Sequence, residues 1–346
     1  MDMISTLTLT NFRNHETFRI NTDSKNIALV GANGTGKTNV LEGISLLNGG
    51  TGIRHAQSSE IARFGTNNYA VCANLFDGNE ISVFWNGSGH RAAQINGERM
   101  PLSELAKQIA IIWLTPREDL LFLDSPSTRR TFFDNLVAGF DAKHIGYVSR
   151  LGKLLSERAY ALKNTCDDDW LEQIEKNIAS MATSVADARV RFISELNHFF
   201  DAGKVGLSGI AEKMLIDDEK TSSFEVFYKN HLSQNRFLVS DKMAIDGPHR
   251  TDFMVTNSGL NLPAAQTSSG QQKALLYRLI IANVNLIRAR NPDKAIIVLL
   301  DEADGHLDKT SRETLLNELS GTNAQIWVTG SDRSAFDLLS ANVCQL

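Results

Sequence analysis

An eight-residue segment, GANGTGKT at residues 31–38, restricts the folds open to this chain more than any other feature of its sequence. It fits the pattern G-x-x-x-x-G-K-[ST], follows the apolar run NIALV and precedes the apolar, helix-like run NVLEGISLL. Glycines here let backbone N–H groups curve around phosphate oxygens, and the start of the following helix adds further donors. The segment therefore predicts a phosphate-binding loop between a buried strand and a helix. Its candidate ligand contacts are Gly31, Ala32, Asn33, Gly34, Thr35, Gly36, Lys37 and Thr38.

Two acids that follow another apolar run supply what the loop lacks. The run AIIVLL is followed directly by Asp301 and Glu302. Asp301 is expected to hold Mg²⁺ through water, and the hydroxyl of Thr38 to complete the shell of the same ion. Lys37 is expected to reach the β- and γ-phosphates, and Glu302 to orient or deprotonate the attacking water.

The expected nucleotide is ATP. The two motifs lie further apart in the sequence than in a small GTPase, and the guanine-reading pattern Asn-Lys-x-Asp is absent. The sequence therefore predicts an ATPase with ATP and Mg²⁺ as cofactors. Lys37 and Glu302 are its candidate catalytic residues, and Thr38 and Asp301 are its candidate metal ligands.

The pattern of apolar residues predicts an α/β fold. NIALVG and AIIVLL alternate little, as strands covered on both faces of a parallel sheet do. ISTLTLTNF, YAVCANLF and EISVFWNG predict further strands, Asn96-Gly97 predicts a hairpin turn, and strands are also expected at SFEVFYK (223–229) and DFMVT (252–256).

Helical spacing replaces the strand pattern near residue 141. Apolar residues then recur at steps of three and four, a seven-residue repeat that predicts two helices packed as an antiparallel pair. So short a repeat favours an ordinary helical subdomain over a long protruding coiled coil. The expected organisation is a discontinuous α/β lobe, residues 1–145 and 221–346, with a helical insertion at 146–220. The longer repeat consists of Leu171, Ile174, Ile178, Met181, Val185, Ala188 and Phe192.

Charge and composition exclude several classes of protein. The formal net charge is −5, so any binding of nucleic acid must depend on a local basic surface. No apolar run approaches the roughly 20 residues that span a bilayer, and the N-terminus lacks the pattern of a secretory signal. The 3 cysteines are widely spaced and form no CxxC pair, which argues against structural disulfides and zinc. We expect a cytoplasmic protein without membrane attachment.

Several segments resemble a known family. GANGTGKTN, TSSGQ, VLLDEADGHLD and LTLTNFRNHE are similar to the heads of ABC-type ATPases of the SMC group. LTPREDLLFLDSPSTRRTFFD, DGPHRTDF and SSGQQKALLYRLIIA are similar to the RecF family of recombination mediators. The resemblance runs almost end to end and is weakest in the helical insertion. It implies an ABC-type ATPase head with an inserted helical subdomain.

The resemblance also implies roles for individual residues. Ser268 and the backbone at Gly270 would contact ATP held by a second subunit, so that ATP joins a homodimer. Arg13 matches an arginine near the nucleotide, although a solvated arginine at a strand end is an equal alternative. Asp308 matches a loop that crosses the dimer interface. For Arg129-Arg130 and His249-Arg250, both a turn or ion-pair role and a phosphate contact remain open.

The function implied by the resemblance is ATP-dependent DNA binding in recombinational repair and replication-gap processing. The partners would be double-stranded DNA, gapped or single-stranded junctions, and mediator proteins of the RecO and RecR type, with assistance to recombinase loading as the outcome. A nucleotide-gated protein scaffold without direct DNA recognition is the alternative. An ABC transporter subunit is a further possibility, against which the segment WVTGSDR argues.

Two departures from the ABC pattern predict slow hydrolysis. WVTGSDR has Gly330 and Ser331 where transporter ATPases carry a switch histidine. LTPRED has Arg117 and Glu118 where a glutamine is typical. Both changes remove groups that sense the γ-phosphate, so ATP is expected to act as a switch.

Overall fold

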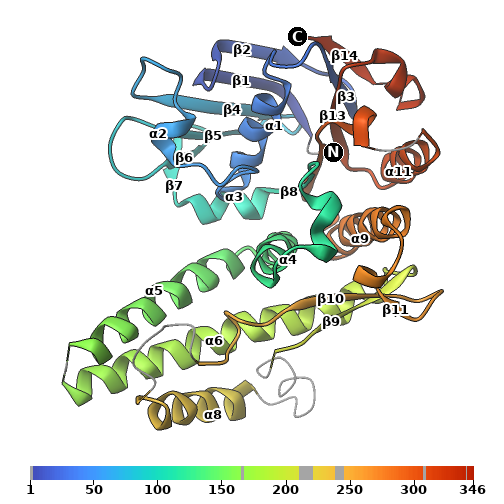
Figure 1. The fold of residues 1–346 in the computed structure, drawn as a ribbon. Helices are drawn as coiled ribbons and strands as arrows, with labels where there is room; N and C mark the ends of the chain where they lie inside the picture. The colour runs from blue at the N-terminus through green and yellow to red at the C-terminus, as the bar shows by residue number, and fades with distance from the viewer. Residues whose placement is uncertain (1–2, 165–166, 210–220, 238–244, 307–308, 340) are drawn as a thin grey trace. The chain divides into compact units, whose positions relative to one another are not determined.

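The computed structural model describes residues 3–164, 167–209, 221–237, 245–306, 309–339 and 341–346. The chain forms two compact units (Figure 1). Unit 1 combines Met1–Asp119 with Leu276–Leu346, and unit 2 is Leu120–Leu275. Among the described residues, no helix is both long and apolar enough to cross a membrane.

A parallel sheet of five strands lies in unit 1, in the order β14-β3-β13-β12-β8. All four of its strand pairs are parallel. Every residue of β8, β12 and β13 is buried, as the nearly continuous apolar runs predict. The strands are β3 (Asn26–Val30), β8 (Ile109–Leu114), β12 (Ala295–Leu300), β13 (Gln325–Gly330) and β14 (Asn342–Gln345).

An antiparallel sheet of six strands forms the other layer of unit 1, in the order β2-β1-β4-β5-β6-β7. Asn96 and Gly97 have φ values of 52° and 81° between β6 and β7, so the predicted hairpin turn is confirmed. The strands are β1 (Ile4–Phe12), β2 (His15–Asn21), β4 (Tyr69–Leu75), β5 (Glu80–Trp85), β6 (Ala92–Ile95) and β7 (Glu98–Met100).

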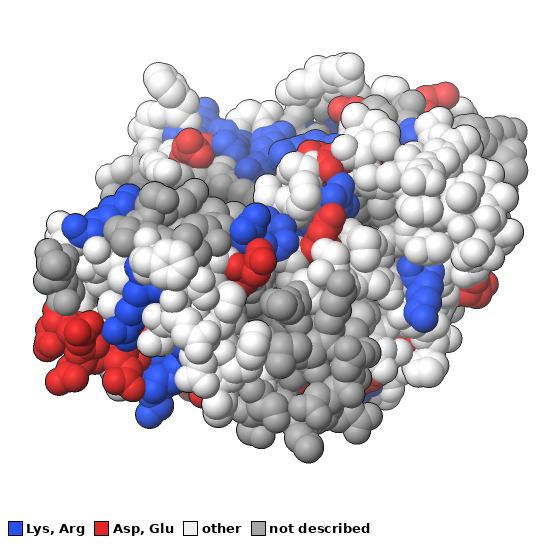
Figure 2. Space-filling view, turned by 60° about the horizontal axis from the view of Figure 1, so that its bottom comes forward, with Lys and Arg blue, Asp and Glu red and all other residues white. Residues whose placement is uncertain are grey.

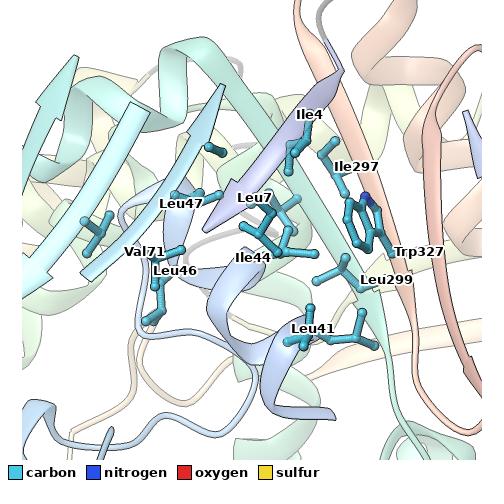
Figure 3. Packing of buried hydrophobic residues seen from close by; sticks show 14 of the residues in the cluster. Ile4, Leu7, Leu41, Ile44, Leu46, Leu47, Val71, Ile297, Leu299 and Trp327 are labelled. Atoms are coloured by element: carbon cyan, nitrogen blue, oxygen red, sulfur yellow. The ribbon is translucent and has the colours of Figure 1, made fainter. Parts of the chain in front are cut away.

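Helix α1 (Lys37–Ser45) follows the phosphate loop and lies between these two sheets. In Figure 3 its Leu41 and Ile44 lie among Leu7 of β1, Leu299 of β12 and other apolar side chains of both sheets, and all belong to one buried cluster. The start of the helix is therefore fixed by the core beneath it. The other helices of unit 1 are η1 (Leu46–Asn48), α2 (Ser58–Ile61), α3 (Leu102–Gln108), α10 (Ala303–His306), α11 (Lys309–Gly321) and η4 (Arg333–Leu339).

Unit 2 is built on the predicted helix pair, α5 (His144–Lys163) and α6 (Asp168–Leu196). Six of the seven apolar repeat positions on α6 are buried and Met181 is partly buried, so the predicted seven-residue repeat is confirmed. The unit also contains α4 (Pro126–Phe140), α8 (Thr221–Gln234) and a three-stranded sheet of β9 (Gly203–Leu207), β10 (Phe253–Asn257) and β11 (Leu262–Pro263). The short helix η3 (Ala264–Gln266) precedes α9 (Ser269–Arg290). The limits between the units fall inside two helices, η2 (Glu118–Leu123) and α9, so part of each belongs to either unit.

The strand expected at SFEVFYK is wrong, because this segment forms helix α8. Phe224, Tyr228 and Leu232, spaced by one helical turn, are at most 1% exposed in the core with α5 and α6. Val226, which a strand would place on the same face as Phe224, is 63% exposed. The packing of α8 on α6 therefore decides a segment whose apolar pattern fits both periods.

The compact units do not coincide with the boundaries expected at 146 and 220. Unit 2 is wider because ion pairs join its helices to elements on either side of that interval. Arg189 of α6 binds Asp134 of α4 at 2.9 and 3.0 Å. Arg129 of α4 binds Asp252, just before β10, at 2.8 and 2.6 Å. Helix α4 and the three-stranded sheet are thereby built into the helical unit.

A buried amide joins the two sheets of unit 1. Gln325 of β13 accepts from the backbone N–H of Ile4 at 3.0 Å and donates to the carbonyl of Ile4 at 2.9 Å. The same Oε1 accepts from the indole N–H of Trp327 at 3.2 Å. Gln325 is fully buried, so it holds β1 of the antiparallel sheet against the parallel sheet.

We predict that Gln325→Leu lowers the free energy of unfolding by about 2–4 kcal/mol, because buried backbone and indole groups lose their partners. Urea denaturation followed by circular dichroism measures this change. Gln94→Leu is the matched control, since Gln94 on β6 is half-buried and no hydrogen bond of its side chain is found among the described residues. Equal effects of the two substitutions would contradict the prediction.

Candidate nucleotide-binding site

The carboxyl ends of three neighbouring strands of unit 1 carry the predicted site residues. β13 pairs with both β3 and β12, so the residues that follow these strands meet at one edge of the sheet. A cavity of about 420 Å³ lies at this edge. It is lined by Asn33, Gly34, Gly36, Lys37, Thr38, Asn39, Arg54, Glu302, Asp304, Gly330 and Ser331.

The phosphate loop takes a form that needs glycine. Gly34 and Gly36 have φ values of 88° and 103°. A Cβ at Gly36 would also lie 2.6 Å from the His15 ring and 2.7 Å from the Asn14 amide, so the turn between β1 and β2 packs directly on the loop. Lys37 donates from Nζ to the carbonyls of Gly31 at 2.7 Å and Ala32 at 2.8 Å, which places its ammonium inside the curve of the loop. In the same loop, the Thr35 hydroxyl donates to the Ala32 carbonyl at 3.0 Å.

A line of hydrogen bonds joins the loop to the acids after β12. The Thr38 hydroxyl donates to Oδ1 of Asp301 at 3.0 Å, and Thr329 at the end of β13 donates to the same oxygen at 2.6 Å. Thr329 also accepts from the backbone N–H of Glu302 at 2.8 Å. Glu302 has a φ of 51°, an uncommon value for a non-glycine residue, and this bond fixes it there. Thr329 thus orients both acids.

Thr38 and Asp301 suit Mg²⁺. A hydroxyl and a carboxylate oxygen are hard donors, and Mg²⁺ in nucleotide sites takes few protein ligands and completes its shell with phosphate and water. No group of three or more His, Cys, Asp or Glu side chains placed to hold a metal is found among the described residues, so a dedicated all-protein cage is not part of this edge. If the ion binds here, the pair Thr38 and Asp301 would hold it.

Asp304 connects the acidic segment to the turn that follows β13. Its Oδ2 accepts from the Ser331 hydroxyl at 2.8 Å and from the backbone N–H of Asp332 at 3.0 Å, and also from the backbone N–H of Ser331. Burial acts in the opposite direction, but these hydrogen bonds hold the pKa of Asp304 below its usual range. Ser331, at the position without a switch histidine, is therefore occupied by a partner in its own subunit.

The arginine expected near the nucleotide, Arg13, is paired with a carboxylate of α1. Arg13 forms a bidentate pair with the buried carboxylate of Glu42, at 2.8 and 2.5 Å, and donates to the carbonyl of Glu60 at 2.6 Å. It is not among the residues that line the cavity. Arg54, which shares Glu42 at 3.0 Å and binds Asn39 at 2.8 Å, does line it. No motif around Arg54 marks it in the sequence.

Ser268 and Gly270, which are expected to contact ATP held by a second subunit, lie at the start of α9 in unit 2, more than 200 residues after the phosphate loop in the sequence. Ser268 and Gln271 form a reciprocal cap: the Ser268 Oγ accepts from the backbone N–H of Gln271 at 3.4 Å, and the Gln271 side chain accepts from the backbone N–H of Ser268 at 3.0 Å. Ser268, Ser269 and Gly270 are all exposed. A Cβ at Gly270 would meet no atom within 4 Å.

Two further positions from the sequence analysis are Glu118 and Asp308. Glu118 accepts from both the backbone N–H and the hydroxyl of Thr115 at 2.7 Å. Burial raises the pKa of Glu118 in spite of these hydrogen bonds. Its carboxylate is thus held within its own turn. Asp308 lies outside the described residues.

These features together define the head of an ABC-type ATPase. They are a parallel sheet covered by an antiparallel sheet, a phosphate loop, the acid pair Asp301-Glu302 after a buried strand, and an exposed helix start at Ser268. The family described as "RecF/RecN/SMC N terminal domain" matches residues 3–344. The "DNA replication and repair protein RecF" of Caulobacter vibrioides is 34% identical over 96% of this chain and 93% of its own length. The protein of the same name from Rickettsia felis is 33% identical over 99% and 97%.

A solved structure of the "recombination mediator protein RecF-ATPrS in RecFOR pathway" superimposes with a TM-score of 0.87 over 100% of this chain and 96% of that one. Its 20% identity supports the fold alone. The chain belongs to the RecF family of DNA replication and repair proteins, within the RecF/RecN/SMC group of ATPases.

We predict that Thr329→Val lowers ATP turnover about 10–100-fold, because the outer partner that orients the metal-binding and water-activating acids is lost. ATP affinity should fall much less, since Lys37 and the loop are unchanged. Thr329→Ser restores the hydroxyl and should recover most of the turnover. Steady-state hydrolysis and calorimetric nucleotide binding measure the two effects, and a wild-type rate in Thr329→Val would rule out this role.

Proposed function

We propose that this protein is an ATP-operated switch that dimerises with ATP and Mg²⁺ and then binds DNA during recombinational repair and replication-gap processing. The observation that carries the nucleotide part is the line of hydrogen bonds from Thr38 through Asp301 to Thr329 at the edge of the cavity. It brings together residues from the two distant motifs that ATP hydrolysis requires.

Each residue at the edge has a distinct task. Lys37 supplies the positive charge within the loop, next to backbone donors that face the phosphates. Glu302 lines the cavity and would orient or deprotonate the attacking water, while Thr329 holds its backbone. When bound at Thr38 and Asp301, Mg²⁺ would neutralise charge on the phosphates.

The start of α9 supports a dimer joined by ATP. Gly270 lowers helix stability relative to alanine by up to about 1 kcal/mol, and among the described residues no atom lies close enough to require a glycine there. A glycine that the fold does not need, among exposed serines at a helix N-terminus, suits close approach of a phosphate from another subunit. We infer that this surface receives the γ-phosphate of ATP held by a second copy.

Slow hydrolysis is consistent with two groups already engaged. Ser331 is bound by Asp304, and Glu118 is bound to the Thr115 turn. Neither is free to respond to the γ-phosphate without first breaking these contacts. A slow ATPase suits a switch whose ATP-bound dimer must persist while it acts.

DNA, RecO-type and RecR-type proteins are proposed as partners, with gapped or single-stranded junctions as DNA targets and recombinase loading as the outcome. The names of the curated relatives and of the RecFOR-pathway structure support this assignment. We place the protein in the cytoplasm, where its DNA substrate would be found. A net charge of −5 requires that DNA contact a local basic surface.

The function is tested by DNA binding with and without ATP across a salt series. We expect tighter binding with ATP and Mg²⁺, a steep loss of affinity as salt rises, and no ATP response in Lys37→Met. Glu302→Gln should bind ATP, hydrolyse it poorly and accumulate as a dimer on DNA. Equal DNA affinity with and without ATP would favour the nucleotide-gated scaffold instead.

The dimer is tested separately by Gly270→Arg and its control, Gly152→Arg on α5. Both glycines are exposed helix residues whose added Cβ would meet nothing within 4 Å, so both variants should fold. Only Gly270→Arg should lose ATP-induced dimerisation and turnover, as measured by light scattering and hydrolysis. Because the contact is made in trans, mixing Gly270→Arg with Lys37→Met should restore one composite site. A Gly270→Arg protein that still dimerises with ATP would refute the interface.

A further inference from the structure

Two motifs without an assigned role, Arg129-Arg130 and His249-Arg250, come together in unit 2. The backbone N–H of Arg250 donates to the Gly247 carbonyl at 2.8 Å, which closes a turn with Pro248 and His249 at its centre. Arg130 on α4 donates to the carbonyls of Arg250 at 3.3 Å and Thr251 at 3.2 Å. The turn and the helix therefore form one surface of the unit.

Two neighbouring arginines, the partly buried Arg129 and the buried Arg189, are matched by carboxylates. Arg129 forms a bidentate pair with Asp252, and Arg189 forms one with Asp134 and also donates to the Pro248 carbonyl at 2.7 Å. Asp134 in addition binds the ring of His144 at 2.7 Å. Asp134 and Asp252 are thus engaged by other groups, and these pairs hold the turn in place.

Arg130, unlike Arg129 and Arg189, has no carboxylate within ion-pair distance among the described residues. Its guanidinium donates to carbonyl groups. Asp134 and Asp252 act on it only from a distance, because each is bidentate with another arginine. Burial and the like charge of Arg189 lower the pKa of Arg130. A half-buried guanidinium beside two others is unfavourable unless an anion joins them.

His249 adds an unused polar group to the same place. Both ring nitrogens are buried, and among the described residues neither has a partner in good hydrogen-bond geometry. The nearby backbone of Ile245 acts to raise the pKa of the ring. Burial, with the charges of Arg250 and Arg130, lowers the pKa of His249 to about 4, so the imidazole is neutral at pH 7 and keeps one N–H donor. Arg250 is 45% exposed and pairs at 3.2 Å with Asp246, which is 69% exposed.

Another part of unit 2 is unsuited to anions. Asp167, Asp168 and Asp169 are exposed at the turn between α5 and α6, and acidic side chains gather at that end in Figure 2. A polyanion is repelled there. The surface formed by α4 and the 247–250 turn differs, because Arg130 there has no carboxylate within ion-pair distance among the described residues.

We propose that Arg130 and Arg250, beside the buried ring of His249, form a phosphate-binding site that contacts the backbone of DNA. The proposal rests on the DNA-binding function proposed above. Guanidinium donors suit a phosphate diester, a neutral imidazole next to them adds no competing charge, and such a contact positions DNA without reading its sequence. A phosphate of the nucleotide has the same chemistry, so the test has to distinguish the two sources.

The test measures binding of a short DNA duplex to the full chain with ATP and Mg²⁺ across a salt series. Arg130→Gln is expected to weaken binding about tenfold at low salt and to reduce the slope of log K against log salt by about 1. Arg130→Lys, which keeps the charge, should recover most of both. Arg191→Gln is the matched control, since Arg191 on α6 is an exposed arginine paired with Asp187 and should leave both values unchanged.

Arg250→Gln guards against misfolding, because the Arg250 side chain is 45% exposed and its loss should weaken DNA binding in the same direction. If Arg130→Gln and Arg250→Gln both bind DNA like the wild type, the site is refuted while the proposed function stands. If the wild type itself binds no DNA at any salt, both fall. If Arg130→Gln binds DNA normally but loses ATP-induced dimerisation, the phosphate belongs to the nucleotide and the DNA contact is refuted.

Discussion

The hydroxyl of Thr329 is the contact on which the catalytic edge depends. It is fully buried at the end of β13, the strand between β3 and β12, and therefore reaches residues that follow both neighbours. Its donation to Asp301 and its acceptance from the Glu302 backbone turn three strand ends into one site. Because the Thr329 hydroxyl itself is fully buried, leaving it without these partners would be costly. The parallel order of the strands thus becomes a chemical arrangement only through this side chain.

Much of this site follows from the sequence, because its signals are local. The phosphate loop needs glycines at fixed spacing, and the acid pair directly follows a buried strand, so adjacent residues carry both. Thr329 and Arg54 could not be found this way. A threonine at the end of an apolar strand is ordinary, and its role depends on which strand lies beside it. Arg13 and Arg54 share one buried carboxylate, Glu42, so the sequence shows an arginine near the loop without deciding which of them faces the cavity.

The wrong prediction of a strand at residues 223–229 has the same origin. Phe224, Val226 and Tyr228 satisfy a period of two, while Phe224, Tyr228 and Leu232 satisfy a helical period, and seven residues cannot decide between them. Burial against α6 decides for the helix. The limits of unit 2 depend on pairs such as Arg129 with Asp252, 123 residues apart, which no composition change marks. The heptad-like repeat of α6 was predicted correctly because its signal extends over many turns and outweighs local ambiguity.

Gly270 and Arg130 are linked by a common argument. Each residue is one that the stability of its own subunit would not select. Gly270 stands in a helix where no described neighbour excludes a side chain. Arg130 stands near other arginines, and Asp134 and Asp252 beside it are each paired with another arginine. Departures of this kind are tolerated when a ligand outside the chain compensates for them. In both cases the surroundings present donors, so the compensating group is an anion. A phosphate of ATP from a second copy suits the first, which is a helix start without side-chain charge. A phosphate of DNA suits the second, where the fixed cations of α4 and the turn can exchange counterions for a polyanion in spite of the net negative charge of the chain.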